Sequence, residues 1–201
     1  MANSSIILPV LVTILTAGGP ALESTPMLID DFSRSDGCSP AGACWTVFSD
    51  RVMGGLSEAR AETGTEDGRR HLRLHGRVTL ANNGGFIQTA LDLGEGDAPL
   101  DARAFSGIRL EVKTADPGTG YALHLRTPDC ILPWQHYKAE IPADAGWRTV
   151  IIPFAEFRAY RLGNPLDTRR LLRLGLVAGG GEFPADLRVR RIELVGKEGH
   201  E

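Results

Sequence analysis

The stretch Trp45–Ser57, which reads WTVFSDRVMGGLS, departs from the alternating pattern of the rest of the chain and guides the prediction of its fold. An adjacent acid and base, Asp50 and Arg51, precede the double glycine Gly54-Gly55, and apolar side chains surround all four residues. Glycines reach backbone conformations that residues with a Cβ reach only at a cost. The pattern therefore predicts a tight backbone passage that holds a charged pair close to the core.

A second passage of the same kind follows at residues 82–86, which read NNGGF. Asparagine side chains favour local turn bonding, and the double glycine Gly84-Gly85 again precedes an aromatic side chain. Two such loops on one small domain are candidates for a single site, with Asp50, Arg51 and Asn83 as residues that contact a ligand or partner. The favoured interpretation is structural: a buried carboxylate and guanidinium lock the loops through charge-assisted hydrogen bonds.

Elsewhere, short runs of alternating apolar and polar residues are separated by turn residues. Ile108, Leu110 and Val112, for example, alternate with charged side chains, which is typical of a strand with one buried face. About ten such runs, and no convincing long helix, predict an all-β sandwich. A switch of apolar parity predicts a bulge near Arg190-Arg191. Residues 147–152, largely apolar on both parities, predict a central strand covered on both sides.

Two of these strands are predicted to form a hairpin that carries a candidate binding face. If residues 122–126 pair with residues 134–138 symmetrically about Cys130 and Ile131, His124 faces His136 and Arg126 faces Trp134. The ligand or partner candidates on this face are Arg126, Trp134 and His136. His124 and His136 are weak candidates for a metal pair, since no third ligand is evident. Two interpretations compete with a binding face: an ordinary amphipathic sheet face, and a Trp134 packed under its own loop.

Length and charge limit the possible classes of protein. The 201 residues, 42% of them hydrophobic, suffice for one well-buried domain. We expect that domain over residues 28–196 and a polar tail at residues 197–201. The formal net charge is -3 and the 22 basic residues are spread along the chain, so nucleic acid and anionic membranes are not expected partners.

The amino-terminal segment has an apolar run, Ile6–Thr16, that is shorter than the roughly 20 residues of a membrane-spanning helix. The run resembles the apolar part of a signal peptide, and small residues that suit cleavage follow it, although no Lys or Arg precedes it. Residues 1–22 are therefore predicted to be a signal peptide or, alternatively, a disordered segment. We expect export to the periplasm or the outside, with a cytoplasmic location as the alternative and no membrane span in the mature chain.

The cysteines agree with export. Cys38 and Cys44 lie six residues apart in a loop rich in glycine and proline, where a disulfide is sterically plausible. Cys130 is then the odd thiol. No zinc pattern accompanies the three cysteines.

The order of the motifs carries a resemblance to a known family. DRVMGG (50–55) is followed by His75-Gly76, NNGGF (82–86), YALHLRT (121–127) and WRTVIIPFAEF (147–157). In this order, from about Leu28 to about Val195, the chain resembles the complex I intermediate-associated protein 30 family. The resemblance implies a jelly-roll sandwich similar to galactose-binding domains.

The function that the resemblance implies is a non-catalytic binding domain that acts as a protein-binding or assembly factor. The alternative is a carbohydrate or small-ligand binding module of an exported protein, which the fold and the Arg126, Trp134 and His136 face suggest. Residues 55–59 fall one residue short of a G-x-S-x-G nucleophile elbow, because Ala59 replaces the last glycine. We therefore predict no catalytic residue, and we expect no cofactor.

Overall fold

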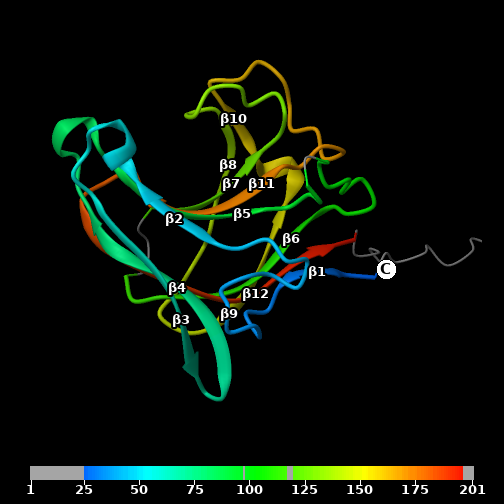
Figure 1. Cartoon of the computed structure of the whole chain (residues 1–201), viewed down its shortest axis with the longest axis horizontal. Helices are drawn as coiled ribbons and strands as arrows, with labels where there is room; N and C mark the ends of the chain where they lie inside the picture. Colours follow the sequence, from blue (N-terminus) through cyan, green and yellow to red (C-terminus); the bar gives the residue numbers. More distant parts are fainter. Residues whose placement is uncertain (1–24, 97, 117–119, 197–201) are drawn as a thin grey trace, which may run out of the picture.

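The computed structural model describes residues 25–96, 98–116 and 120–196, which form two antiparallel sheets packed face to face (Figure 1). Within these residues each sheet has six strands, which confirms the predicted all-β sandwich. The signal peptide expected at residues 1–22 and the tail expected at residues 197–201 lie outside the described residues.

The chain crosses between the two sheets several times, so each sheet contains strands from along the whole described sequence. The first sheet contains β1 (Met27–Asp30), β3 (Glu58–Glu66), β4 (Arg69–Val78), β6 (Gly107–Thr114), β9 (Arg148–Pro153) and β12 (Phe183–Val195). The second sheet contains β2 (Thr46–Ser49), β5 (Phe86–Asp92), β7 (Tyr121–Arg126), β8 (His136–Glu140), β10 (Arg158–Tyr160) and β11 (Arg173–Gly179). Short 3-10 helices are η1 (Asp50–Met53), η2 (Ala81–Asn83) and η3 (Phe154–Glu156).

The first sheet has the strand order β3-β4-β12-β6-β9, and β1 also pairs with β12. The long strand β12 pairs with β4 through residues 183–189 and with β1 through residues 192–194. Its register with β6 shifts between Val189 and Arg191, so the predicted bulge is confirmed. The extra residue allows Val189 and Ile192, on either side of the bulge, both to face the core.

The second sheet has the order β10-β8-β7-β11-β5-β2, so β10 and β2 are its two edges. Apolar side chains at alternate positions of β6 and β7 point into the core between the sheets. Leu110 and Leu123, one from each sheet, are both 0% exposed. Each such side chain contributes roughly 1.5 to 3 kcal/mol through removal from water.

One strand prediction was wrong. Residues 147–152 were expected to form a central strand, but β9 is an edge strand and its Ile151 is 42% exposed. Ile151 is apolar but lies on the outer face of β9, so the sequence pattern wrongly predicted burial on both faces. Glu58–Glu66 forms β3, a strand that the alternation of apolar residues does not predict. Asp67 and Gly68 form the tight turn into β4, with φ of 53° and 74°.

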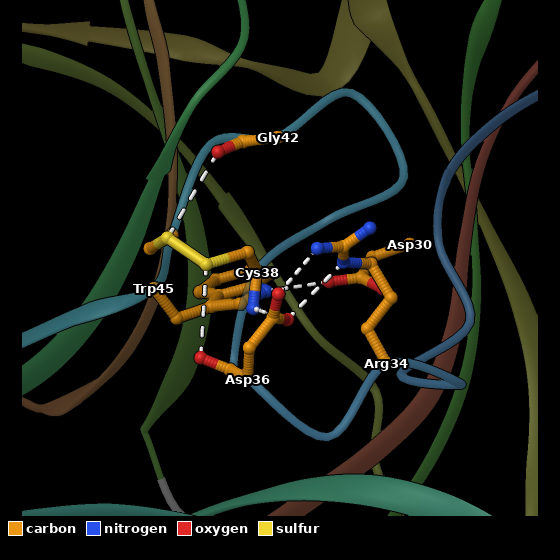
Figure 2. The surroundings of a disulfide bond; sticks show 7 residues. Asp30, Arg34, Asp36, Cys38, Gly42 and Trp45 are labelled. Carbon is orange, nitrogen blue, oxygen red and sulfur yellow. Dashed lines mark hydrogen bonds and ion pairs between the residues drawn. A yellow bond between two sulfur atoms is a disulfide. The ribbon is translucent and has the colours of Figure 1, made fainter.

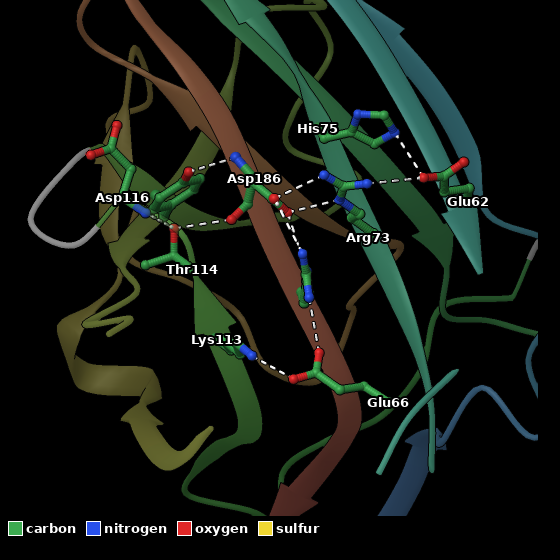
Figure 3. A network of polar contacts seen from close by, with 10 residues as sticks. Glu62, Glu66, Arg73, His75, Lys113, Thr114, Asp116 and Asp186 are labelled. Atoms are coloured by element: carbon green, nitrogen blue, oxygen red, sulfur yellow. Dashed lines mark hydrogen bonds and ion pairs between the residues drawn. The ribbon is translucent and has the colours of Figure 1, made fainter. Parts of the chain in front are cut away.

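The outer face of the first sheet is covered by paired charges (Figure 3). Arg73 donates two hydrogen bonds of 2.9 Å to Asp186, and Glu66 accepts from both Lys113 and Arg188. The bond from Lys113 and the bond from Arg188 lower the pKa of Glu66 to about 2 against a smaller opposing effect of burial. This part of the face satisfies its own charges.

The loop after β1 is closed by a disulfide between Cys38 and Cys44 (Figure 2). Beside it, the Trp45 indole Nε1 donates a 2.7 Å hydrogen bond to Asp30, whose pKa is raised mainly by burial. The Trp45 ring also contacts Phe32, with ring centroids 5.9 Å apart. Cys130 is buried and unpaired. The disulfide closes the loop on itself, and the Trp45 contacts attach it to the end of β1.

Candidate functional site

The two double-glycine loops meet at Asp50. Its side chain is fully buried and accepts hydrogen bonds from Ser57 N at 2.9 Å, Gly85 N at 2.6 Å and Phe86 N at 3.3 Å, and a further one from the Ser57 hydroxyl. These donors come from both loops, so a single carboxylate joins η1 to the start of β5. The expectation that the loops come together is confirmed. We call Asp50, Ser57 and the two double glycines the double-glycine junction.

The glycines let the backbone approach this carboxylate. A Cβ on Gly55 would overlap the Asp50 carboxylate, and a Cβ on Gly84 would lie 2.5 Å from Asp50 Oδ2 and 2.8 Å from Thr79 O. Gly54 instead has φ of 90°, which favours glycine for its backbone conformation. Gly54 and Gly55 are thus required for different reasons.

The predicted pairing of Asp50 with Arg51 was wrong. The Arg51 side chain is 60% exposed, lies 3.7 Å from Glu58, and donates from Nε to Ser57 O at 3.0 Å. Burial alone would raise the pKa of Asp50, but the bonds from Ser57, Gly85 and Phe86 outweigh it and lower the pKa. Neutral donors replace the expected guanidinium, because backbone N–H groups solvate a buried carboxylate well.

The residues in and around the double-glycine junction differ in their exposure to solvent and therefore to a ligand. Asp50 and Ser57 are both 0% exposed, so neither residue is placed to contact a ligand or to act as a nucleophile. Asn83 is exposed and has φ of 57°, which places it at the turn of η2. Large apolar side chains are exposed around the same loops: Val47 44%, Val52 71%, Met53 55%, Leu56 51% and Leu80 53%. We call these five residues the apolar tip.

The predicted hairpin forms, but its register differs by two residues. His124 pairs with Lys138 across β7 and β8, where His136 was expected. A shift of two residues keeps every side chain on its predicted face. The inward residues Tyr121, Leu123, Leu125, Tyr137, Ala139 and Ile141 are all at most 4% exposed.

On the outward face three rings stack across three strands. The His124 and His136 ring centroids are 3.7 Å apart at an interplanar angle of 12°, and His136 and Tyr160 are 4.9 Å apart at 18°. Tyr160 is 48% exposed and pairs with His136 through β10. We call His124, His136 and Tyr160 the ring stack. Sequence reasoning missed Tyr160 because the three-residue strand β10 carries too little periodicity to be recognised.

Small and short residues lie beside the ring stack on the same outer face. The register aligns Ala90, Gly175 and His124 across three neighbouring strands, and Gln88, Val177 and Ala122 form the next row. Gln88 lies over Gly175, since a Cβ on that glycine would overlap the Gln88 amide. These neighbours of the ring stack are themselves largely buried, with Ala90 and Ala122 each 1% exposed and Gln88 9% exposed.

The imidazoles are held neutral. Burial, reinforced by the nearby His136 and Lys138, lowers the pKa of His124 to about 2. Burial also lowers the pKa of His136, and its Nδ1 lies 2.9 Å from the Trp134 carbonyl oxygen. A carbonyl only accepts, so Nδ1 carries the proton and donates to it. Because the His124 and His136 rings stack face to face, their in-plane lone pairs lie in nearly parallel planes and do not converge on one metal ion. In the described residues no group of three metal-ligating side chains occurs.

Arg126 has a contact pattern that the sequence did not suggest. Its guanidinium donates to the carbonyl oxygens of Cys130 at 2.7 Å, Pro133 at 3.1 Å and Leu132 at 3.2 Å. It thus shapes the loop that presents Trp134, which is 49% exposed. Trp134 does not pack under its own loop. Gln135 links the same loop to Arg161, just after β10, through a 2.9 Å hydrogen bond.

None of the helices among the described residues is long and apolar enough to cross a bilayer.

Several solved structures of carbohydrate-binding modules are similar to this chain. The family 11 module of the cellulosomal cellulase Lic26A-Cel5E of Clostridium thermocellum has a TM-score of 0.67 at 17% identity, over 88% of this chain and 98% of that one. The same organism's family 11 module in complex with a β-1,3-1,4-mixed-linked tetrasaccharide gives 0.66 at 17% identity, over 90% and 99%. The family 30 module of its cellulase Cel9D-Cel44B gives 0.62 at 15% identity, over 88% and 100%. The likeness shows that this chain has a jelly-roll sandwich fold.

The family follows from the sequence itself. Residues 31–187 match the family of complex I intermediate-associated protein 30 (CIA30), and the chain belongs to that family. Among curated proteins no relative matches the chain.

Proposed function

We propose that this chain is a non-catalytic binding domain that holds a carbohydrate chain on the outer face of its second sheet. The observation that carries the proposal is the ring stack, in which Tyr160 is 48% exposed at the end of two stacked imidazoles. Sugar rings present apolar C–H faces that pack on flat aromatic surfaces, while their hydroxyl groups need donors and acceptors nearby.

The polar groups around the stack suit hydroxyl groups. His124 and His136 are neutral at physiological pH, so their free ring nitrogens donate or accept without the cost of desolvating a charge. Lys138 and Glu140, paired at 2.7 Å on the same face of β8, add charged groups at the edge. Trp134 supplies a second exposed aromatic surface in the adjoining loop.

The disulfide between Cys38 and Cys44 supports an exported location for this function, since such bonds persist in oxidising compartments. The family 11 module of Clostridium thermocellum in complex with a β-1,3-1,4-mixed-linked tetrasaccharide supplies a first probe. We expect this chain to bind a β-glucan or another neutral polysaccharide.

The test is affinity electrophoresis against a panel of soluble polysaccharides, followed by calorimetry with oligosaccharides of any that bind. Tyr160→Ala and Trp134→Ala should each weaken binding about tenfold or more, the loss that removal of one aromatic contact typically causes in a binding site. Ile151→Ala, which removes an exposed apolar side chain from the other sheet, is the control and should bind normally. Full affinity in both aromatic variants would rule out this face.

A second candidate function, a protein-binding or assembly role, is supported by the apolar tip. Large exposed apolar patches on soluble domains commonly mark interaction surfaces. The double-glycine junction holds η1 next to β5, so Met53 and Leu80 are presented by a rigid base. The test is co-purification from the native host with wild type, Met53→Glu and Tyr160→Ala. A partner lost only with Met53→Glu supports the assembly role, and one lost with neither variant contradicts it.

A further inference from the structure

The bulge in β12 brings two consecutive arginines to the outer side of the first sheet. Val189 and Ile192 both face the core, so the two residues between them, Arg190 and Arg191, are left outside it. Both oppose the single residue Glu111 of β6 in the shifted register. The parity switch that predicts the bulge from sequence thus also predicts a local concentration of positive charge.

The bulge lies where β12 exchanges one neighbour for another. Its pairing with β4 ends at Val189 and its pairing with β1 begins at Ile192. A cavity of about 320 Å³ opens at this junction. Its lining comes from three segments: Asp31 and Ser33 after β1, residues 68–70 at the turn into β4, and Arg190 with Arg191.

Four guanidinium groups line this cavity against one carboxylate. Arg70 donates to neutral acceptors, the Phe32 carbonyl at 2.8 Å and the Thr63 hydroxyl at 3.1 Å, and has no carboxylate partner among the described residues. The one lining acid, Asp31, accepts from Ser33 N at 3.1 Å. Together with Glu111 and Glu193, which hold three of these arginines from behind, Asp31 brings the acids to three, so the four guanidinium groups leave a positive excess of one at the cavity.

The other guanidinium groups are fixed in place from behind. Arg69 binds Glu111 through two hydrogen bonds of 3.1 and 2.7 Å, and Arg190 binds the same carboxylate. Arg190 also stacks on the Trp147 ring, with 4.3 Å from its guanidinium carbon to the ring centroid. Arg191 is held by Glu193 at 2.7 Å. A guanidinium has more N–H donors than these contacts use, so the groups are oriented while donors remain available.

We propose that this cavity is a binding site for a sulfate or phosphate group carried by a small organic ligand. Guanidinium groups that come from two segments, the turn into β4 and the bulge of β12, offer donors in diverging directions, which matches a tetrahedral oxyanion better than a planar carboxylate. The cavity is much larger than a bare oxyanion, which leaves room for an attached organic group. The site lies on the first sheet and is independent of the carbohydrate site proposed on the second.

The experiment is calorimetry of the full chain at constant ionic strength, with inorganic sulfate, inorganic phosphate, acetate and glucose 6-phosphate as separate probes. Sulfate and phosphate should bind saturably and acetate should not, and tighter binding of glucose 6-phosphate would identify an ester as the ligand. Arg70→Gln should weaken binding about tenfold, as expected for loss of a charge-assisted hydrogen bond. Ser33→Glu, which adds a negative charge and leaves every arginine in place, should weaken it as much.

Arg148→Gln is the matched control, because Arg148 is an exposed arginine of the same sheet outside the cavity and should bind normally. Circular dichroism of each variant checks that the fold is kept. Absence of saturable binding to wild type, equal affinity for acetate, or full affinity in both Arg70→Gln and Ser33→Glu would overturn the proposal. Tyr160→Ala should leave oxyanion binding unchanged, so a failed glycan site and a failed oxyanion site give different results.

Discussion

The Asp50 carboxylate lies 2.6 Å from the backbone nitrogen of Gly85, a residue 35 positions further along the chain. This bond joins two loops that begin on different strands, η1 after β2 and η2 before β5. The carboxylate is fully buried and receives only neutral donors. The junction therefore stabilises the fold and, through it, the position of the exposed apolar tip.

Asp50→Ala should lower the free energy of unfolding by about 3 kcal/mol or more, because it leaves several buried N–H groups without an acceptor. Asp50→Asn should cost nearly as much, since an amide cannot accept from every direction as a carboxylate does. Arg51→Ala, the neighbouring control, should change the free energy by less than about 1 kcal/mol because that side chain is exposed. Urea denaturation measures all three. Equal losses in Asp50→Ala and Arg51→Ala would contradict the assigned contacts.

Gly55→Ala and Gly84→Ala should each destabilise the fold by several kcal/mol, because the new Cβ would overlap the Asp50 carboxylate or approach it to 2.5 Å. Gly146→Ala is the control: no atom lies within 4 Å of its added Cβ, and its change should stay within about 0.5 kcal/mol. Thermal denaturation checks the order. A neutral Gly55→Ala would mean that the carboxylate lies elsewhere in solution.

Acidification should destabilise the fold through the ring stack. The folded state keeps His124 neutral, with its pKa lowered by burial to about 2, whereas the ordinary value is 6.5. Below pH 6.5 the unfolded state binds a proton that the folded state does not, so the free energy of unfolding falls as the pH decreases. His136 and Lys138 face the same ring and act in the same direction.

The measurement is the melting temperature between pH 7.5 and about pH 5, above the range in which most carboxylates titrate. His124→Phe keeps a stacked ring and removes the titrating group, so its loss of stability over this range should be smaller than that of wild type. Identical pH profiles for the two proteins would contradict the burial of a neutral imidazole.

Loss of the disulfide should cost at most roughly 2 to 3 kcal/mol, because Cys38 and Cys44 close a short loop. The Cys38→Ser and Cys44→Ser double variant, compared with Cys130→Ser, measures this by denaturation. Alkylation of the native protein after unfolding without reductant should modify Cys130 alone. Modification of all three cysteines would refute the disulfide and weaken the argument for export.

The alternation of apolar residues predicted the sandwich, the bulge at Arg190-Arg191 and the inward face of β7 and β8. Strands with one apolar face repeat every two residues, and this period is visible without coordinates. β3 was not predicted because the side chains that it packs against the core, such as Ala59 and Ala61, are small. The edge position of β9 could not be predicted, since strand order depends on long-range pairing.

The candidate site was predicted only in part. His124 and His136 were expected to lie together, and they do, although the hairpin register differs by two residues. The Arg126 contacts with three carbonyl groups, the role of Tyr160 and the cavity between β1 and β4 all depend on loop conformation. Adjacent acid and base residues suggested an Asp50–Arg51 pair, but the backbone turns their side chains in different directions, one buried and one exposed.

The most direct test of the carbohydrate-binding proposal is a titration of the isotopically labelled protein with a β-1,3-1,4-mixed-linked tetrasaccharide, followed by nuclear magnetic resonance. The proposal predicts that the largest shift changes occur at His124, His136, Tyr160 and the Trp134 indole, and that they saturate. Val52 and Leu80 at the apolar tip should be unaffected. Shift changes confined to the apolar tip or to the first sheet, or no saturable change with this or any other glycan of the panel, would contradict it.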